Sequence, residues 1–221
     1  MRVLFCSALP DKEAVLGVDV ERRQIEAASM SAAVEYVPSP AVTLGHLIHD
    51  LQRVRPTVLH FSGHGGRVAG GADAVFLLGD SGLSEELDAD GLDAVLMDAG
   101  SSVRLVVLNA CHSLPLADVA ARRAGLAIGM SRAIADAAAI RFSQAFYGAV
   151  SAARPVKEAF DAGCKAAVLT GHQRSVPREV LTPAHGTAPP VPVLVARSDV
   201  DPARLALTDA ASMDLDNRRP R

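Results

Sequence analysis

Two short stretches of the sequence end in side chains that could carry out nucleophilic chemistry. Residues 57–66 read TVLHFSGHGG and place His64 among glycines, and residues 104–113 read RLVVLNACHS and place Cys111 directly after an apolar run. A thiol and an imidazole that lie close together can form a nucleophile and general-base pair. The sequence therefore predicts a His64–Cys111 pair, provided that the fold brings the two side chains together.

Both stretches have the features of buried parallel strands. Their apolar runs are short, rich in β-branched residues and bounded by turn residues, as is typical of strands covered on both faces. In open parallel α/β sheets, functional residues gather just beyond the carboxyl ends of the strands. We therefore expect His64 and Cys111 at one edge of a sheet, with a crossover helix and a loop between their strands.

The rest of the chain alternates predicted strands and helices. We expect strands at residues 2–9, 34–37, 126–130 and 191–196, a short strand or hairpin at 74–78, helices at 18–30, 44–54, 84–97, 116–124, 134–152 and 156–169, and a glycine-rich loop at 65–71. The β-α-β-α-β order of the first third predicts an α/β fold whose parallel strands are joined by right-handed crossovers.

Length and composition indicate one domain. The chain has 221 residues, 49% of them hydrophobic, which is enough for a single well-buried core. We assign this domain to residues 1–210. Residues 211–221 contain no recurring apolar pattern and are predicted to form a disordered tail.

Charge and cysteine content narrow the class of protein. The formal net charge is −3, and no run of Lys or Arg suggests nucleic-acid binding. The sparse, odd set of cysteines (Cys6, Cys111 and Cys164) argues against a disulfide scaffold and for a reducing compartment. No signal-peptide core and no apolar stretch of the roughly 18 residues needed to span a membrane is present. We therefore expect a soluble, cytoplasmic protein.

Other polar residues suggest no cofactor or metal. His46 and His49 share a helix face but lack further ligands at suitable spacing, and the glycines of residues 64–71 lack the Lys-Ser/Thr of a phosphate loop. His60 is predicted to be a hydrogen-bonded core residue. We interpret Asp136 as the N-cap of the long helix, with a position facing a substrate groove as the alternative.

Three segments together resemble a known family. LHFSGHGG, VVLNACHS and FSQAFYGAVSAARPVKEAF occur in this order and extend the likeness over roughly residues 1–170. They resemble the CHAT domain, the caspase-like module of clan CD cysteine peptidases. The resemblance implies a three-layer sandwich, with helices on both faces of a mostly parallel central sheet. It also implies a His–Cys dyad that is controlled by a protein partner in prokaryotic stress or defence.

The resemblance assigns roles to particular positions. His64 matches the family's general base, Cys111 the nucleophile, and the backbone N–H groups of Gly65 and Cys111 the oxyanion donors. Many relatives carry Asp two residues before the nucleophile, where it recognises a basic P1 side chain. The neutral Asn109 stands there, so the motif argues against specificity for Arg or Lys. Fused repeat or sensor domains are absent from the sequence, so we expect any regulator to be a separate chain.

The resulting functional hypothesis is a cysteine endopeptidase that acts on protein substrates. The groove near its site would include Asn109 and Asp136. One alternative is a catalytically silent caspase-like adaptor. The other is a flavodoxin-like ligand-binding signalling domain, since a similar fold can serve many functions. That second alternative predicts a phosphate site, but no glycine-rich signature follows the first strand.

Overall fold

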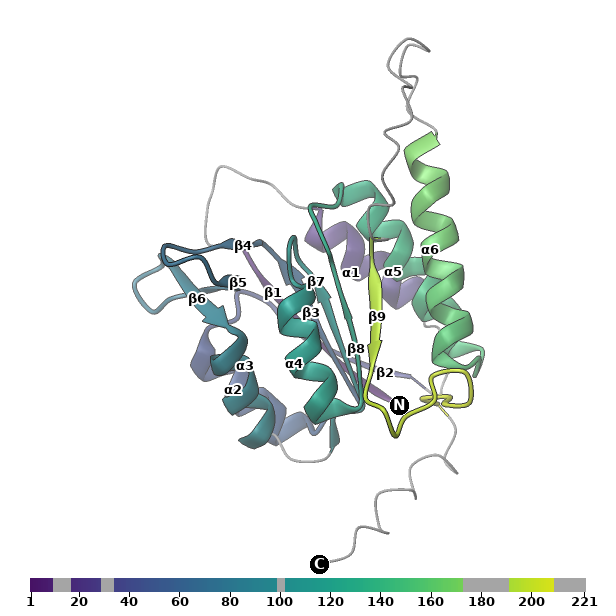
Figure 1. Ribbon diagram of the computed structural model, residues 1–221, viewed down its shortest axis with the longest axis horizontal. Helices are drawn as coiled ribbons and strands as arrows, with labels where there is room; N and C mark the ends of the chain where they lie inside the picture. Colours follow the sequence, from purple (N-terminus) through teal and green to yellow (C-terminus); the bar gives the residue numbers. More distant parts are fainter. Residues whose placement is uncertain (10–16, 29–33, 99–101, 173–190, 209–221) are drawn as a thin grey trace, which may run out of the picture.

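The computed structural model describes residues 1–9, 17–28, 34–98, 102–172 and 191–208, and a six-stranded sheet lies at its centre (Figure 1). The spatial strand order is β2-β1-β3-β7-β8-β9, and β9 alone runs antiparallel to its neighbour among these strands. The strands are β1 (Arg2–Ala8), β2 (Glu35–Ser39), β3 (Val58–Gly63), β7 (Leu105–Asn109), β8 (Leu126–Gly129) and β9 (Val193–Ala196).

Helices cover both faces of this sheet. One layer contains α1 (Val18–Ala28), α5 (Asp136–Ser151) and α6 (Val156–His172), and the other contains α2 (Leu44–Val54), α3 (Ala89–Asp98) and α4 (Leu114–Ala124). Each layer has its own apolar cluster against the sheet. The predicted α/β class, with a mostly parallel sheet between two helical layers, is confirmed.

Burial on both faces explains the composition of the central strands. Every residue of β3 and β7 is buried. Successive residues of β7 alternate between the two clusters, because side chains along a strand point to opposite faces. A strand covered on both sides therefore reads as a continuous apolar run, and this is why the sequence located β3 and β7.

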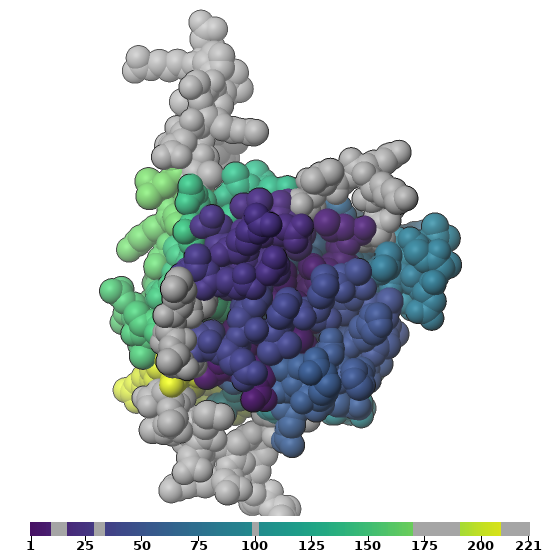
Figure 2. Space-filling view, turned by 180° about the vertical axis from the view of Figure 1, so that it is seen from behind, coloured from purple at the N-terminus to yellow at the C-terminus, as the bar shows by residue number. Residues whose placement is uncertain are grey.

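Of a second, smaller sheet, only the strand or hairpin at 74–78 was predicted. This sheet consists of three antiparallel strands, β4 (Gly65–Arg67), β5 (Asp73–Leu78) and β6 (Ser84–Asp88). The prediction of a loop was therefore wrong at residues 65–67, and the helix predicted at 84–97 begins only at Ala89. Pairing with β5 overrides the local helix propensity of the Glu-rich β6 segment. The β5–β6 hairpin projects from the edge of the molecule (Figure 2).

The other predicted elements agree with the structure to within a few residues. The helix predicted at 44–54 is α2, with the same bounds, and the late strand predicted at 191–196 is β9. The predicted tail at 211–221 lies outside the described residues. Of the helices described, none combines the length and the apolar character needed to cross a bilayer.

Candidate functional site

Strand register brings His64 and Cys111 to the same edge of the main sheet. The parallel strands β3 and β7 are neighbours, and Ser62 of β3 lies opposite Asn109 of β7. His64 and Cys111 each follow their strand two residues beyond this pair. Neighbouring strands are only about 4.8 Å apart, so the two loops leave the sheet side by side.

Gly65 shows how closely these two loops approach each other. A Cβ atom at this position would lie 2.5 Å from the Cys111 carbonyl oxygen and 3.0 Å from the Ala110 Cβ. Real Cβ atoms do not approach a backbone oxygen this closely, so only glycine fits. The glycine next to His64 is therefore a consequence of contact with the cysteine loop.

The backbone N–H of Gly65 is not used in the pairing of β4 with β5. The Phe76 N–H donates to the His64 carbonyl over 3.1 Å, which makes these two residues a hydrogen-bonded pair of the antiparallel ladder. The next pair, Gly65 and Val75, is then a non-hydrogen-bonded one. The Gly65 N–H accordingly points away from β5.

A tight turn carries Cys111 from β7 into α4. Ser113 is fully buried, and its Oγ donates to the Leu108 carbonyl over 2.9 Å and accepts from the Met130 N–H over 3.0 Å. His112 has φ 58°, in the left-handed region. His is among the non-glycine types that adopt this region more readily. The turn leaves Cys111 partly exposed and His112 exposed.

Replacing Ser113 should destabilise this turn. We expect Ser113→Ala to lower the free energy of unfolding by about 1–3 kcal/mol, because a buried N–H and a buried carbonyl would lose their partner. Urea denaturation measures the change. Ser151→Ala is the matched control, since its Oγ has no hydrogen-bond partner among the described residues. Equal losses in the two variants would contradict the role of the Ser113 clamp.

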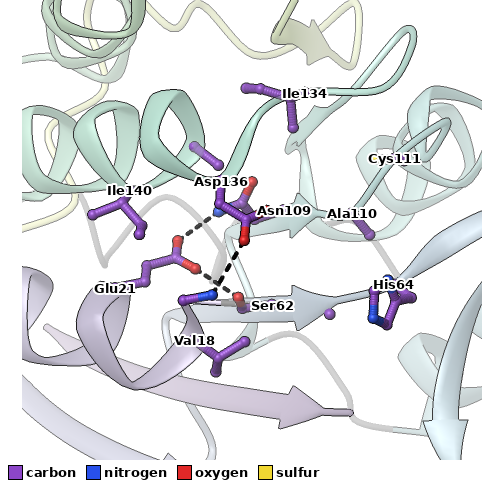
Figure 3. A pocket seen from close by; sticks show the side chains of 13 residues that line it. Val18, Glu21, Ser62, His64, Asn109, Ala110, Cys111, Ile134, Asp136 and Ile140 are labelled. Carbon is purple, nitrogen blue, oxygen red and sulfur yellow. Dashed lines mark hydrogen bonds between the residues drawn. The ribbon is translucent and has the colours of Figure 1, made fainter. Parts of the chain in front are cut away.

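A pocket lies beside the two loops and extends beneath α1 and α5 (Figure 3). Its volume is about 50 Å³. His64 and Cys111 lie toward one end of it, and Glu21 and Ser62 toward the other. The lining residues are Gly17, Val18, Glu21, Ser62, Gly63, His64, Asn109, Ala110, Cys111, Ile134, Asp136, Ala139 and Ile140.

A buried carboxylate joins the strands to the two helices at this pocket. Glu21 of α1 has only 2% of its surface exposed. Its Oε1 accepts from Asn109 Nδ2 and from Ser143 Oγ, and its Oε2 accepts from Ser62 Oγ, each over 2.6 Å. These donors satisfy the carboxylate in the core, as a buried charged group requires.

His60 lies behind the carboxylate. Its Nε2 is 3.3 Å from Glu21 Oε1, a distance at which charges interact, although the direction is poor for a hydrogen bond. Its Nδ1 is 3.0 Å from the Tyr147 hydroxyl. The prediction that His60 is a hydrogen-bonded core residue is confirmed.

Glu21 is ionised at neutral pH. Burial by itself raises the pKa of Glu21, but the contact and charge of His60 and the hydroxyls of Ser143 and Ser62 outweigh it. The pKa consequently lies below its ordinary value of 4.5. Glu21 therefore contributes a negative charge to the wall of the pocket.

The structure places both predicted groove residues in this pocket. Asn109 and Asp136 are among its lining side chains. The N-cap prediction for Asp136 was wrong, because Ala135 is the N-cap residue of α5 and Asp136 is the first residue of the helix. The Asp136 Oδ2 instead accepts from the Gly17 N–H over 3.3 Å, next to the start of α1.

Sequence reasoning missed Glu21. Val18, Glu21 and Ile25 form one buried stripe of α1 at helical spacing. A carboxylate within such a stripe must find donors or a counter-charge in the core. A charged residue on the apolar face of the helix was therefore the feature of the sequence that could have revealed Glu21. Its partners Ser62 and Ser143 could not be inferred without the packing of α1 against β3 and α5.

The thiols of Cys6 and Cys164 ionise less readily than the thiol of a surface cysteine. Burial raises the pKa of Cys6, and burial with the nearby charge of Asp161 raises that of Cys164 to about 11. In the described part of the chain, no group of three or more His, Cys, Asp or Glu side chains is arranged to hold a metal ion.

The fold is that of the caspase-like cysteine peptidases. A solved structure with this architecture, described as the crystal structure of the Arg specific cysteine proteinase gingipain R, superposes with a TM-score of 0.50 at 13% sequence identity. The match covers 77% of this chain and 43% of that one, so the chain spans less than half the length of that proteinase.

The sequence itself identifies the family. Residues 7–179 match the profile of the CHAT domain. This chain therefore belongs to the CHAT domain family, as the resemblance predicted. No curated protein matches the sequence.

Proposed function

We propose that this protein is a caspase-like cysteine endopeptidase that cleaves protein substrates with a His64–Cys111 dyad. The register between β3 and β7 carries the proposal, because it sets both side chains two residues beyond one strand pair and beside one pocket. The Nε2 of His64 is buried and has no hydrogen-bond partner within the described part of the chain. No other described side chain therefore competes for this nitrogen.

The proposed chemistry proceeds in two steps. The Cys111 sulfur attacks the scissile carbonyl carbon while its proton passes to His64. The N–H groups of Gly65 and Cys111 hold the resulting oxyanion. The C–N bond then breaks, the leaving amine takes the proton from His64, and an acyl-enzyme remains on the sulfur. Water then attacks the thioester carbonyl carbon while His64 removes its proton. The C–S bond breaks, the carboxylic acid product leaves, and the proton returns from His64 to the Cys111 sulfur.

Alkylation of the native protein tests the special position of Cys111. We expect iodoacetamide at pH 7.5 to modify Cys111 at least about tenfold faster than Cys6 or Cys164, because only the thiolate reacts and burial raises the pKa of the other two thiols. Peptide mass spectrometry over a time course measures each site.

Two histidine variants test whether Cys111 reacts quickly because of His64 or only because it is exposed. His64→Ala should slow the alkylation of Cys111, while His49→Ala, on the distant helix α2, should not. Equal labelling of the three cysteines, or none at Cys111, would contradict the endopeptidase and favour a catalytically silent adaptor.

We also propose that a protein partner controls the enzyme within a cytoplasmic stress or defence pathway of a prokaryote. Support for this comes from the CHAT domain family alone. The purified chain should then cleave a mixture of unfolded proteins slowly by itself. Rapid cleavage of many unrelated substrates without a partner would show that partner control is wrong.

A further inference from the structure

We propose that the outer edge of β6 is a docking site for an extended, basic segment of a protein partner, which adds a strand to the small sheet. Strand β6 is the last in the order β4-β5-β6, so no described strand covers its outer side. The inference rests on the proposed control by a protein partner, for which it supplies a place and a chemistry. The binding itself does not require the dyad.

Hydrogen bonding shows which backbone groups of β6 face outward. The Gly79 N–H donates to the Leu83 carbonyl over 2.7 Å. By the alternation of an antiparallel ladder, Leu83 and Glu85 therefore direct their backbone groups toward β5. Ser84 and Glu86 direct theirs outward, and neither has a backbone partner there among the described residues. This edge thus offers the N–H and C=O groups of two residues to an incoming strand.

The edge of β6 lacks the features that usually block an exposed strand. Natural edges are often protected by Pro, Lys or a bulge. In β2, an end strand of the main sheet, the Glu35 N–H donates to the Met1 carbonyl over 2.9 Å, which turns Pro38 outward. Pro38 has no N–H to offer on that side. By contrast, β6 contains neither Pro nor Lys and pairs with β5 residue for residue.

Acidic side chains select the kind of strand that can bind. Residues 68–103 contain eight Asp or Glu and no Lys or Arg, although the whole chain has a net charge of only −3. Asp80, Glu85, Glu86 and Asp88 are exposed on the hairpin, and no ion pair among the described residues includes them. Pairing of β6 with β6 of a second copy would oppose like charges. The charge therefore disfavours a second copy and favours a basic partner.

The small sheet connects this edge to the loop of His64. Phe76 of β5 lies opposite Glu86, and its N–H donates to the His64 carbonyl over 3.1 Å. The hairpin lies at the edge of the molecule (Figure 2), and Leu83, which is 70% exposed, offers an apolar contact beside β6. A partner on β6 would bind the same sheet that holds the loop of the proposed base.

Two peptides of equal charge test strand addition. We expect the acetylated peptide KTKTKTK to bind the full-length Cys111→Ala protein, which cannot cleave it, at least about tenfold more tightly than KPKPKPK. The proline peptide carries the same charge but cannot pair with a strand edge. Fluorescence anisotropy of labelled peptides measures both affinities, and the acidic ETETETE should bind to neither edge nor surface. Equal affinity for KTKTKTK and KPKPKPK would overturn the inference.

Variants locate the binding on β6. Ser84→Pro removes one outward N–H without changing the charge and should lower the affinity for KTKTKTK at least about fivefold. Ser84→Thr is the matched control and should change it less than about twofold. Replacing both Glu85 and Glu86 by Gln should also lower it at least about fivefold, because the attraction of the Lys side chains is lost. An affinity that none of these variants changes would show that the peptide binds elsewhere and that the inference is wrong.

The test stays decisive if a variant does not fold. Thermal unfolding of Ser84→Pro should be recorded first, and if this variant is unfolded, the peptide pair and the Gln variant decide the result. Self-association that Ser84→Pro abolishes, without preference for the basic peptide, would show that a second copy occupies the edge and would overturn the inference. Binding at β6 without cleavage of any peptide by the wild type would support the docking site and contradict the proposed peptidase. Cleavage without binding at β6 would do the reverse.

Discussion

Cys111→Ala should reduce peptide cleavage to the background of a no-enzyme control. The substitution removes the only atom on which the proposed acyl-enzyme can form, and no neighbouring side chain replaces it. His64→Ala should retain the thiol but lower kcat/KM by about 10²–10⁴-fold, the usual contribution of a general base. Both effects are measured by fluorescence release from a peptide library that varies the P1 residue.

His112 offers a matched control for the imidazole. It adjoins the nucleophile, but its φ of 58° and exposed side chain turn it out of the pocket. His112→Asn keeps a residue type that tolerates the left-handed region and should change kcat/KM by less than about threefold. A large loss in His112→Asn, with His64→Ala nearly unaffected, would show that the base has been assigned to the wrong histidine.

The order of the main strands and helices could be predicted because burial leaves a clear pattern in the sequence. Central strands such as β3 and β7 are apolar on both faces, and α2 has one apolar face and matching caps. Strands β4 and β6 of the small sheet were missed for the opposite reason. Gly65–Arg67 and Ser84–Asp88 are stabilised by pairing with β5, and neither segment has an apolar run of its own.

The residues of the site also fall into those that the sequence pattern revealed and those that it did not. His64, Cys111 and Gly65 stand in or beside recognisable strand ends, so their shared edge follows from strand order and register. Glu21 lies on α1, far in sequence from the ends of β3 and β7. It reaches the pocket only because α1 packs on β3 and α5. The charge of the pocket was therefore inferred from Asn109 alone, and the carboxylate bonded to its Nδ2 was not seen.

Because Asn109 Nδ2 donates to Glu21, Asn109→Asp should be strongly destabilising. The new carboxylate would lie about as close to Glu21 Oε1 as Nδ2 now does, at 2.6 Å. Two buried like charges at that distance cannot both stay ionised. At pH 7 we expect a loss of roughly 3–5 kcal/mol in the free energy of unfolding, comparable to leaving a buried charge unpaired. Asn109→Ala, which removes the hydrogen bond without adding charge, should cost only about 1–3 kcal/mol.

Two further measurements show whether charge causes the loss. Adding Glu21→Gln should restore most of the stability of Asn109→Asp, because the side-chain amide that this substitution introduces can donate to the new carboxylate; urea denaturation of both single variants and the double variant gives their coupling. The pH dependence should also change sign. In the wild type the pKa of Glu21 is lowered, so its contribution is present above about pH 4.5 and is lost as pH falls. In Asn109→Asp the mutual repulsion raises one carboxyl pKa, so the destabilisation should grow as pH rises toward neutrality and shrink in acid. A loss in Asn109→Asp that is independent of pH and unrelieved by Glu21→Gln would show that Glu21 does not carry the negative charge of this pocket.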